Sequence, residues 1–379
     1  MKQSQLSIVK RVAFYIYSLN HGGAERVTSL LANKLSENHV EVTIFIMKAI
    51  DSNSYKLADK VRVVDVSQQP GLKEVANGLW ANVKRLMVLR RLVREYSPQV
   101  LYTMMVSSNV IGSLALVGSG IPCVISERND PVNQVLDKHW RILRRVVYGL
   151  SHAVVAQTPN MKLWLEKNTR ASIVKVIPNP VEFPMLDGQP FVDVPKNLGR
   201  MVIGVGRLCP QKQFTHLIEA FSELSGEFPD WWLAILGEGD DHDKLAMKIS
   251  DVGLADKIYL IGRVGNIGEW YKEAAMFVMT SRYEGYPNAL IEAMASGTPA
   301  VSYDCPSGPA EVIQNNVNGL LVAANNTDEL NQKMRAIMRD SDFAEKISKE
   351  AIQIRSVLNT NSVVEQWLSV AGLRFKSLE

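Results

Sequence analysis

Short runs of apolar residues alternate along most of the chain with longer stretches of helical periodicity. Runs such as Val12–Ser18 and Met201–Val205 have the length and composition of buried strands. The stretches between such runs repeat their apolar residues at the spacing of amphipathic helices. Strands that alternate with helices form parallel sheets with helices on both faces. The pattern therefore predicts an α/β protein built from doubly wound parallel sheets.

The expected strands form two groups, which suits two domains in a chain of 379 residues. Residues 177–199 separate the groups, contain five prolines and show no helical period, so we expect a linker there. The first group comprises Val12–Ser18, Val40–Met47, Val61–Val66, Val100–Met104, Pro122–Ser126, Val154–Ala156 and Ile173–Ile177. The second comprises Met201–Val205, Trp232–Leu236, Ile258–Ile261, Met276–Met279, Ala300–Tyr303 and Gly319–Val322.

Two glutamates bracket the segment EGYPNALIE, which follows the expected strand Met276–Met279. Pro287 suits the first turn of a helix that runs to Gly297. Glu284 then precedes the helix and Glu292 lies within it. The N–H groups and the positive dipole at a helix start attract phosphate. Carboxylates on either side of such a site would bind hydroxyl groups, which is the arrangement that a sugar nucleotide requires.

Two glycine loops add candidate phosphate contacts. The strand that opens the second group ends at Gly206, and the cations Arg207 and Lys212 follow it. Arginine and lysine at this position are suited to neutralise a diphosphate. After the first strand of the chain, Gly22 and Gly23 allow a tight turn into a helix that we expect to begin near Ala24.

These motifs carry a resemblance to a known family. GGAER, then GVGR with a lysine five residues on, then two glutamates separated by seven residues, occur in this order. With LGEGDD and NGLLV they resemble the retaining nucleotide-sugar glycosyltransferases of the GT-B type, family four. GGAER combined with SERNDP and CPSGPAEVI is similar to a subgroup that includes N-acetylgalactosaminyltransferases and extends lipid-linked or surface polysaccharide glycans.

The resemblance implies two Rossmann-like domains that face each other across a cleft. We expect an acceptor-binding domain at residues 1–180, a linker at 181–199 and a nucleotide-sugar domain at 200–360. The final helix, 361–379, would cross back to the N-terminal domain. The implied activity is retaining transfer of a hexose or N-acetylhexosamine from a UDP-sugar.

The resemblance also implies roles for individual residues. Arg207 and Lys212 would hold the donor diphosphate and stabilise it as it leaves. Glu284 would bind the transferred sugar, and Glu292 the ribose diol. Because two cations neutralise the diphosphate, we expect neither a metal nor a cofactor. The further donor contacts would be Gly22 and Gly23 from the opposite domain, Gly206, Gly262 and Arg263 near the base, and Tyr286, Pro287, Asn288, Ala289 and Leu290 around the phosphates.

The N-terminal domain departs from many relatives at ISERNDP, where those relatives have a histidine. Glu127 and Arg128 stand there instead. One interpretation is that Arg128 binds a phosphate or the acceptor and Glu127 orients it. The other is a buried ion pair that holds the loop. Beside the first glycine loop, His21 is the one histidine that we expect to reach the cleft.

Positive charge is concentrated in the first half of the chain. Residues 1–180 contain 24 Lys and Arg against 12 Asp and Glu, whereas the remainder is acidic. Two expected helices place cations opposite apolar residues, and they suit an anionic membrane surface or the phosphates of a lipid carrier. The alternative is that their cations are merely solvated. Nucleic acid is not an expected partner, because no recognition motif accompanies the charge. The cations are Lys84, Arg90, Arg91 and Arg94 in the first helix, and Arg141, Arg144 and Arg145 in the second.

Composition favours a cytoplasmic setting, and with the basic helices and the resemblance we expect a peripheral protein on the inner face of the cell membrane. No signal peptide or spanning segment is expected, and three isolated cysteines suit a reducing compartment. A nicotinamide dehydrogenase is disfavoured, because Cys209 stands where the third glycine of its fingerprint belongs. A UDP-sugar 2-epimerase of the same fold and a non-catalytic sugar-nucleotide-binding protein remain alternatives.

Overall fold

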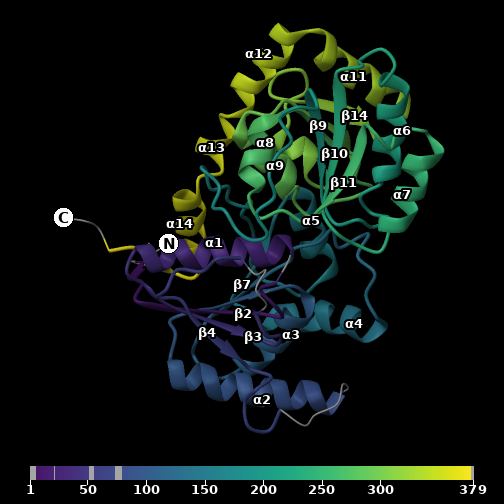
Figure 1. Ribbon diagram of the computed structural model, residues 1–379. Coiled ribbons are helices and arrows are strands. Elements are labelled where there is room, and N and C mark those ends of the chain that lie inside the picture. Colours follow the sequence, from purple (N-terminus) through teal and green to yellow (C-terminus); the bar gives the residue numbers. More distant parts are fainter. Residues whose placement is uncertain (1–5, 21, 51–54, 73–78, 377–379) are drawn as a thin grey trace. The chain divides into compact units, whose positions relative to one another are not determined.

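The computed structural model describes residues 6–20, 22–50, 55–72 and 79–376. The chain divides into two compact units (Figure 1). The N-terminal unit contains Met1–Pro180 and Thr360–Glu379, and the C-terminal unit contains Val181–Asn359. Each unit is built around its own parallel sheet.

The N-terminal unit holds seven parallel strands in the order β4-β3-β2-β5-β6-β7-β8. The order places β2, the first of these strands in the chain, inside the sheet, with later strands added on both sides. The strands are β2 Arg11–Ile16, β3 Glu41–Ile46, β4 Arg62–Asp65, β5 Leu101–Met104, β6 Cys123–Ser126, β7 Ala153–Ala156 and β8 Val174–Val176.

Helices cover both faces of this sheet because its strands are apolar on both sides. Val12 and Phe14 of β2 join one core cluster, while Ala13 and Tyr15 join the other, as strand alternation requires. The helices are α1 Gly23–Glu37, α2 Leu79–Tyr96, α3 Val106–Ala115, α4 Lys138–Val147, α5 Pro159–Asn168 and α14 Thr360–Val370, with a 3₁₀ turn η1 at Tyr148–Leu150.

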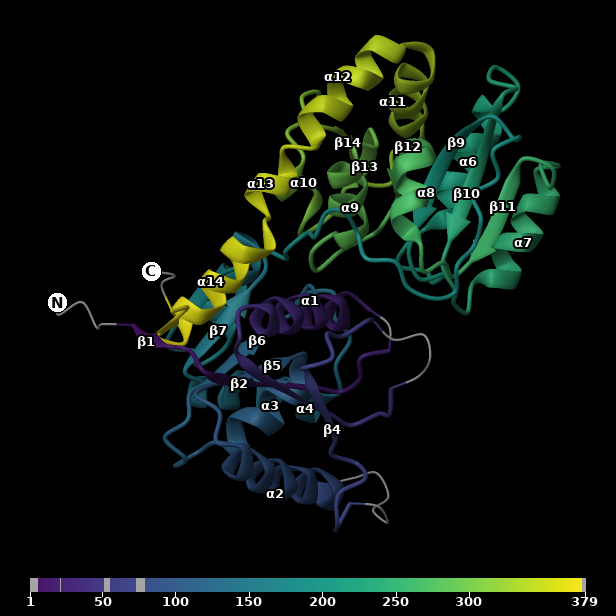
Figure 2. The ribbon, with the colours of Figure 1, turned by 60° about the vertical axis from the view of Figure 1, so that its left-hand side comes forward.

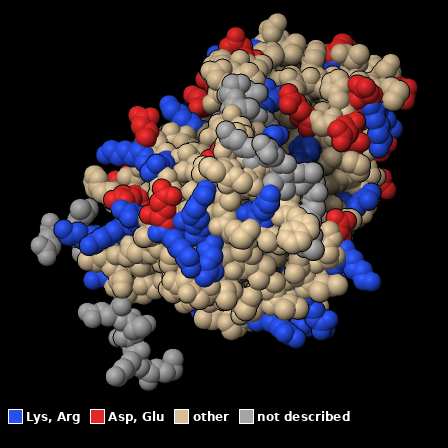
Figure 3. All heavy atoms as spheres, turned by 90° about the horizontal axis from the view of Figure 1, so that it is seen from below, with Lys and Arg blue, Asp and Glu red and all other residues tan. Residues whose placement is uncertain are grey.

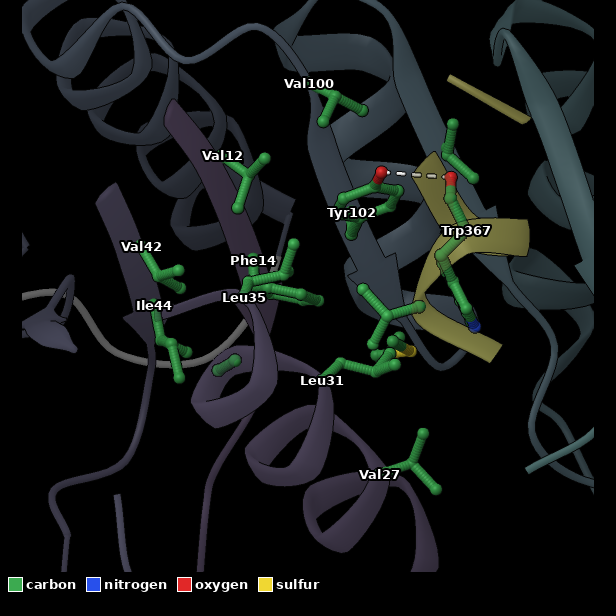
Figure 4. Close-up of a cluster of buried hydrophobic side chains, with 14 of the residues drawn as sticks. Val12, Phe14, Val27, Leu31, Leu35, Val42, Ile44, Val100, Tyr102 and Trp367 are labelled. Atoms are coloured by element: carbon green, nitrogen blue, oxygen red, sulfur yellow. Dashed lines mark hydrogen bonds between the residues drawn. The ribbon is translucent and has the colours of Figure 1, made fainter. Parts of the chain in front are cut away.

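The last helix, α14, packs beside α1 on one face of the N-terminal sheet (Figure 2). Its Trp367 lies in the cluster formed by β2, β3, β5 and α1, where the Tyr102 hydroxyl donates a hydrogen bond to the Trp367 carbonyl at 3.0 Å (Figure 4). Beyond α14, β15 at Leu373–Arg374 pairs in parallel with β1 at Ser7–Ile8. This two-stranded sheet was not predicted, because two-residue strands carry no periodicity.

The C-terminal unit holds six parallel strands in the order β11-β10-β9-β12-β13-β14. Its strands are β9 Arg200–Val205, β10 Trp231–Leu236, β11 Ile258–Gly262, β12 Ala274–Met279, β13 Ala300–Asp304 and β14 Leu320–Ala323. Its helices are α6 Phe214–Leu224, α7 His242–Asp251, α8 Ile267–Glu273, α9 Asn288–Ser296, α10 Pro309–Val312, α11 Thr327–Arg339, α12 Ser341–Ala351 and α13 Ile354–Val357.

The strand order reverses between β9 and β12. From β9 the chain adds β10 and β11 on one side, and then crosses to add β12, β13 and β14 on the other. Ligands of open parallel sheets bind beside the carboxyl ends of the strands at such a reversal. The prediction of two doubly wound parallel sheets is confirmed, and each predicted strand lies within two residues of an observed one.

Candidate active site

The loop that follows β9 carries two cations at the reversal point. Arg207 is exposed, whereas Lys212 is partly buried. A Cβ on Gly206 would lie 2.9 Å from Lys212 Cε, so the glycine leaves room for the lysine side chain. Gly237, after β10, packs directly against the backbone of the β9 loop, since a Cβ there would lie 2.0 Å from the Gly206 carbonyl oxygen. The loop is therefore fixed by close backbone contact.

An ion pair joins the loops after β9 and β12. Lys212 Nζ lies 2.6 Å from Glu284 Oε1, and the two side chains are 18% and 9% exposed. A pair with this little exposure is only weakly screened by water. Both charges act on Cys305 after β13: burial raises its thiol pKa to about 12, the Glu284 carboxylate adds to the rise, and the Lys212 ammonium opposes it. Thus the ends of β9, β12 and β13 converge on one charged site.

The start of α9 lies next to this pair in the chain. Pro287 is the N-cap rather than the first helical residue, and it has no side-chain group with which to cap the helix. N–H groups in a first helical turn lack acceptors within the helix. The loop after β13 packs closely against the start of α9, because a Cβ on Gly308 would lie 2.6 Å from Pro287 Cδ. Asn288, Ala289 and Leu290 form the first turn of α9, after Tyr286, which is buried.

The second glutamate of the motif lies inside α9 and is buried. Glu292 is 6% exposed, and the Tyr271 hydroxyl donates to its Oε2 at 3.4 Å. Tyr271 is itself fully buried at the end of α8, so its position is fixed. At the end of β11, Gly262 adopts a positive φ of 80° directly before Arg263. The Gly262 carbonyl accepts from the Gly237 N–H at 2.8 Å, which ties this loop to the one after β10.

In the N-terminal unit, the glycine loop begins α1. Gly23 is the first helical residue, one position before the predicted start at Ala24, and Gly22 is the N-cap with φ of 139°. Such a φ favours glycine, and a Cβ at Gly22 would also lie 2.5 Å from Glu25 Oε2. As the N-cap residue, Gly22 has no side chain with which to cap this helix. His21 lies outside the described residues.

Glu127 and Arg128 follow β6 and are both buried. Glu127 pairs with Arg144 of α4, with Arg144 Nη1 3.9 Å from Glu127 Oε2. The Tyr148 hydroxyl donates to the same oxygen at 2.9 Å. Burial raises the pKa of the Glu127 carboxyl to about 7, although Arg144 and Tyr148 both favour its ionised form.

Arg128 donates hydrogen bonds to neutral groups. Its Nη2 donates to Asn179 Oδ1 at 2.7 Å, and its Nη1 to Ser126 Oγ at 3.4 Å. Burial lowers the pKa of this guanidinium to about 9, against the opposing effect of the Glu25 charge. Its Nε has no hydrogen-bond partner within the described part of the chain. A buried cation with neutral partners is costly unless an anion joins it.

Two of the seven cations expected on the basic helices are structural. Arg90 Nη1 donates to the carbonyls of Ala115 and Val117 at the end of α3, at 2.9 and 2.8 Å. Arg144 is 3% exposed, since it pairs with Glu127 and its guanidinium lies 4.5 Å from the centre of the Trp164 ring. The surface placement of Arg144 was therefore wrong. The exposed cations are Lys84, Arg91 and Arg94 of α2, and Arg141 and Arg145 of α4.

Sequence reasoning missed several buried polar residues around β6. Asn109 and Tyr148 contact Glu127 or each other, and Asn179 accepts from Arg128. Asn179 follows β8 at the carboxyl edge of the sheet, a position that could have identified it as a candidate. Nothing in the local pattern distinguishes Asn109 or Tyr148. Within the described ranges, no cluster of three His, Cys, Asp or Glu side chains could hold a metal ion.

Family models match both halves of the chain. The model of glycosyl transferases group 1 matches residues 191–354, and that of Glycosyltransferase Family 4 matches residues 21–183. One relative is the "GalNAc-alpha-(1->4)-GalNAc-alpha-(1->3)-diNAcBac-PP-undecaprenol alpha-1,4-N-acetyl-D-galactosaminyltransferase" of Campylobacter jejuni, 27% identical over 95% of this chain and 98% of its own. The amylovoran biosynthesis glycosyltransferase AmsD of Erwinia amylovora is 26% identical over 92% and 95%.

Solved structures show the same fold. A sucrose-phosphate synthase from Thermosynechococcus elongatus superimposes with a TM-score of 0.80 and 18% identity, covering 95% of this chain and 98% of its own. Anabaena HepE, solved in complex with UDP, gives a TM-score of 0.76 at 18% identity over 95% and 98% of the two chains. The expected fold, with two Rossmann-like domains, is confirmed by these likenesses.

Proposed function

This chain belongs to the glycosyltransferases of the GT-B fold, and we propose that it transfers a hexose or N-acetylhexosamine from a UDP-sugar to a glycan acceptor. The observation that carries the proposal is the largely buried ion pair of Lys212 and Glu284 beside the start of α9, whose N-cap residue Pro287 makes no side-chain cap. A cation, a carboxylate and a helix N-terminus at one strand reversal match the charges of a sugar diphosphate.

The donor would lie along the carboxyl ends of β9, β11 and β12. Its diphosphate would bind the first turn of α9 together with Arg207 and Lys212, which then stabilise the charge on the departing UDP. Glu284 would hold hydroxyls of the transferred sugar, and Glu292 would accept from the ribose diol. The base would meet the loop at Arg263. Anabaena HepE, with UDP bound, supports this choice of nucleotide.

Transfer would retain the anomeric configuration and need no metal. Arg207 and Lys212 would supply the positive charge that a divalent metal ion supplies in metal-dependent transferases. The acceptor hydroxyl would attack from the face that UDP leaves, and a phosphate oxygen of the leaving group would take its proton. In this route no side chain forms a covalent bond to the sugar.

The acceptor would be a lipid-linked or surface polysaccharide glycan bound by the N-terminal unit. The Campylobacter relative carries undecaprenol diphosphate in its name, and the Erwinia relative takes part in amylovoran biosynthesis. Arg128 would contact an acceptor phosphate, because it is a buried cation that donates hydrogen bonds to neutral groups, with the Glu25 charge offsetting only part of its burial.

The exposed face of α2 would bind an anionic membrane surface on the cytoplasmic side. Trp80 is 78% exposed and Met87 is 55% exposed, and cations follow them along the helix. Tryptophan beside cations suits the headgroup region of a bilayer. Lys and Arg side chains are visible in several groups on the face seen from below (Figure 3). No helix in the described part of the chain has the length and apolar content to cross a bilayer.

Charge reversal on α2 tests the membrane proposal. A triple variant with Lys84, Arg91 and Arg94 changed to Glu is expected to bind vesicles containing anionic lipid at least tenfold more weakly, because each lost cation removes about 1 kcal/mol of attraction. Cosedimentation with such vesicles measures this. The matched control changes three exposed lysines of the C-terminal unit, Lys244, Lys272 and Lys346, to Glu. Equal loss in both variants would mean that only net charge matters.

Nucleotide binding tests the donor site. With EDTA present, UDP is expected to raise the melting temperature, while GDP, ADP and NAD⁺ have little effect, because a ligand that binds the folded state stabilises it. Thermal-shift measurements with each nucleotide provide the comparison. A shift that requires Mn²⁺ would contradict the metal-free site, and a shift with NAD⁺ alone would contradict the donor assignment.

A further inference from the structure

Buried polar side chains surround Glu127, the residue that precedes Arg128. Glu127 is fully buried, and its Oε2 accepts from the Tyr148 hydroxyl and pairs with Arg144. A buried carboxylate stabilises the folded protein less than an apolar side chain of similar volume does, unless its hydrogen-bond and ion-pair partners are well placed. Such a group is expected where it fixes one conformation of the chain around it.

The network also fixes the backbone next to Glu127. Asn109 Nδ2 donates to the Ser126 carbonyl at 2.8 Å and to the Tyr148 hydroxyl at 3.0 Å. Its Oδ1 accepts from the Thr103 hydroxyl at 2.7 Å. The Tyr148 hydroxyl therefore both accepts and donates, which leaves it one orientation. Through Asn109, helix α3 holds the last carbonyl of β6.

On the α4 side, Arg144 completes the network. Its guanidinium lies against the Trp164 ring of α5 and donates to Gln134 Oε1 at 3.2 Å. It is thus held from three directions, by Glu127, Gln134 and Trp164. A planar guanidinium with this many contacts cannot be replaced by lysine without losing some of them.

Arg128 is held by a separate set of partners. Asn179 Oδ1, which it contacts, also accepts from Gln157 Nε2 at 2.9 Å. Gln157 follows β7 and Asn179 follows β8. Consecutive side chains of extended backbone point to opposite sides, so Glu127 contacts Arg144 of α4 while Arg128 contacts Asn179 after β8. The backbone between them is fixed from both sides.

We propose that Asn109, Tyr148 and Arg144 are positioning residues, which hold Glu127 and thereby set the place of the Arg128 guanidinium. The inference rests on the proposed function, in which Arg128 contacts the acceptor phosphate. It gives Glu127 a role at a distance from the reacting atoms. A small displacement of a positioned group lowers turnover strongly, because the reacting geometry is lost.

Tyr148→Phe, alone and combined with Arg128→Ala, tests this chain of contacts. The substitution removes one hydroxyl and leaves the ring. With UDP-N-acetylgalactosamine and an undecaprenyl-diphosphate-linked N-acetylgalactosamine glycan as probes, we expect kcat to fall about tenfold in the native background. With Arg128 already removed, the same change is expected to lower kcat less than about twofold, because the positioned group is absent. The affinity for UDP is expected to stay within about twofold.

Tyr102→Phe is the matched control. Tyr102 is equally buried in the same unit, and its hydroxyl donates to the Trp367 carbonyl at 3.0 Å. Tyr148→Phe loses two buried hydrogen bonds, with Glu127 and Asn109, and Tyr102→Phe loses one, so both melting temperatures are expected to fall by a few degrees, that of Tyr148→Phe by more. Only Tyr148→Phe is expected to lower kcat. Arg144→Lys, which keeps the charge beside Glu127, is expected to retain more turnover than Arg144→Met.

The possible failures are distinguishable. Full turnover of the single Arg128→Ala variant would show that Arg128 makes no catalytic contact, which contradicts its proposed role at the acceptor phosphate and removes the premise of the inference, while the transferase activity itself stands. If Arg128→Ala is impaired but Tyr148→Phe turns over normally, the positioning role alone is wrong. If Tyr148→Phe lowers kcat equally in both backgrounds, the network acts on stability and not through Arg128, which overturns the inference.

Discussion

Lys212→Ala is expected to lower kcat by about 100-fold or more, the largest effect of any single substitution considered. In the transition state the bond to the leaving UDP breaks, and negative charge grows on the phosphate oxygen. A fixed cation at that oxygen stabilises the transition state more than it stabilises the bound substrate. Loss of the cation therefore lowers kcat. The 2.6 Å contact with Glu284 shows that the ammonium is already fixed in the free protein.

The loss of kcat in Lys212→Ala must be distinguished from a loss of folding stability. Lys212→Ala leaves the Glu284 carboxylate buried without its cation, which costs a few kcal/mol of stability. Turnover is therefore measured well below the melting temperature, with circular dichroism to confirm folding. Lys248→Ala is the matched control, because Lys248 also lies 2.6 Å from a glutamate, Glu219, but on the helices α6 and α7. Near-normal turnover of Lys212→Ala would remove this residue from the mechanism.

Glu284→Gln is expected to lower kcat/KM for the UDP-sugar by about 10- to 100-fold. Hydrogen bonds to a charged group contribute about 1.5–3 kcal/mol, and an amide of the same shape forfeits most of that. The affinity for UDP itself is expected to persist, because UDP lacks the sugar that Glu284 binds. Removal of the carboxylate also releases Lys212 to the diphosphate, which favours UDP binding.

Calorimetry measures the affinity for UDP, and steady-state kinetics measure kcat/KM for the UDP-sugar. Glu219→Gln serves as the control, since it breaks an ion pair of the same length with Lys248, more exposed and outside the site. If Glu284→Gln loses UDP affinity in the same proportion as turnover, Glu284 holds the nucleotide or the fold of the loop. The assignment of the sugar contact would then be wrong.

The fold was predictable because apolar runs and helical periods are local signals. Strands such as β9 and β12 each bury both faces, so their apolar runs stand out from the amphipathic helices around them. The contact between Lys212 and Glu284 is different in kind, since 72 residues separate them. Only the strand order, in which β9 pairs with β12, brings the ends of these strands together, and no local pattern predicts that order.

The buried polar contacts of the N-terminal unit were beyond prediction from local pattern. Arg144 and Arg145 are adjacent on a helix whose outer face is basic, yet Arg144 contacts Glu127 and Trp164 while Arg145 is exposed. Arg90 likewise reaches the carbonyls at the end of α3. A long cationic side chain can be solvated or can satisfy buried acceptors, and the helical period is the same in both cases.

Release of UDP from a UDP-sugar, measured with and without a polyprenyl-diphosphate-linked glycan, tests the central claim most directly. A glycosyltransferase is expected to release UDP rapidly only when the acceptor is present, in step with the glycosylated product, and to do so in EDTA. A UDP-sugar 2-epimerase would convert the donor without acceptor, and a binding protein would release none. Donor conversion independent of the acceptor would contradict the transferase mechanism proposed for Lys212 and Glu284.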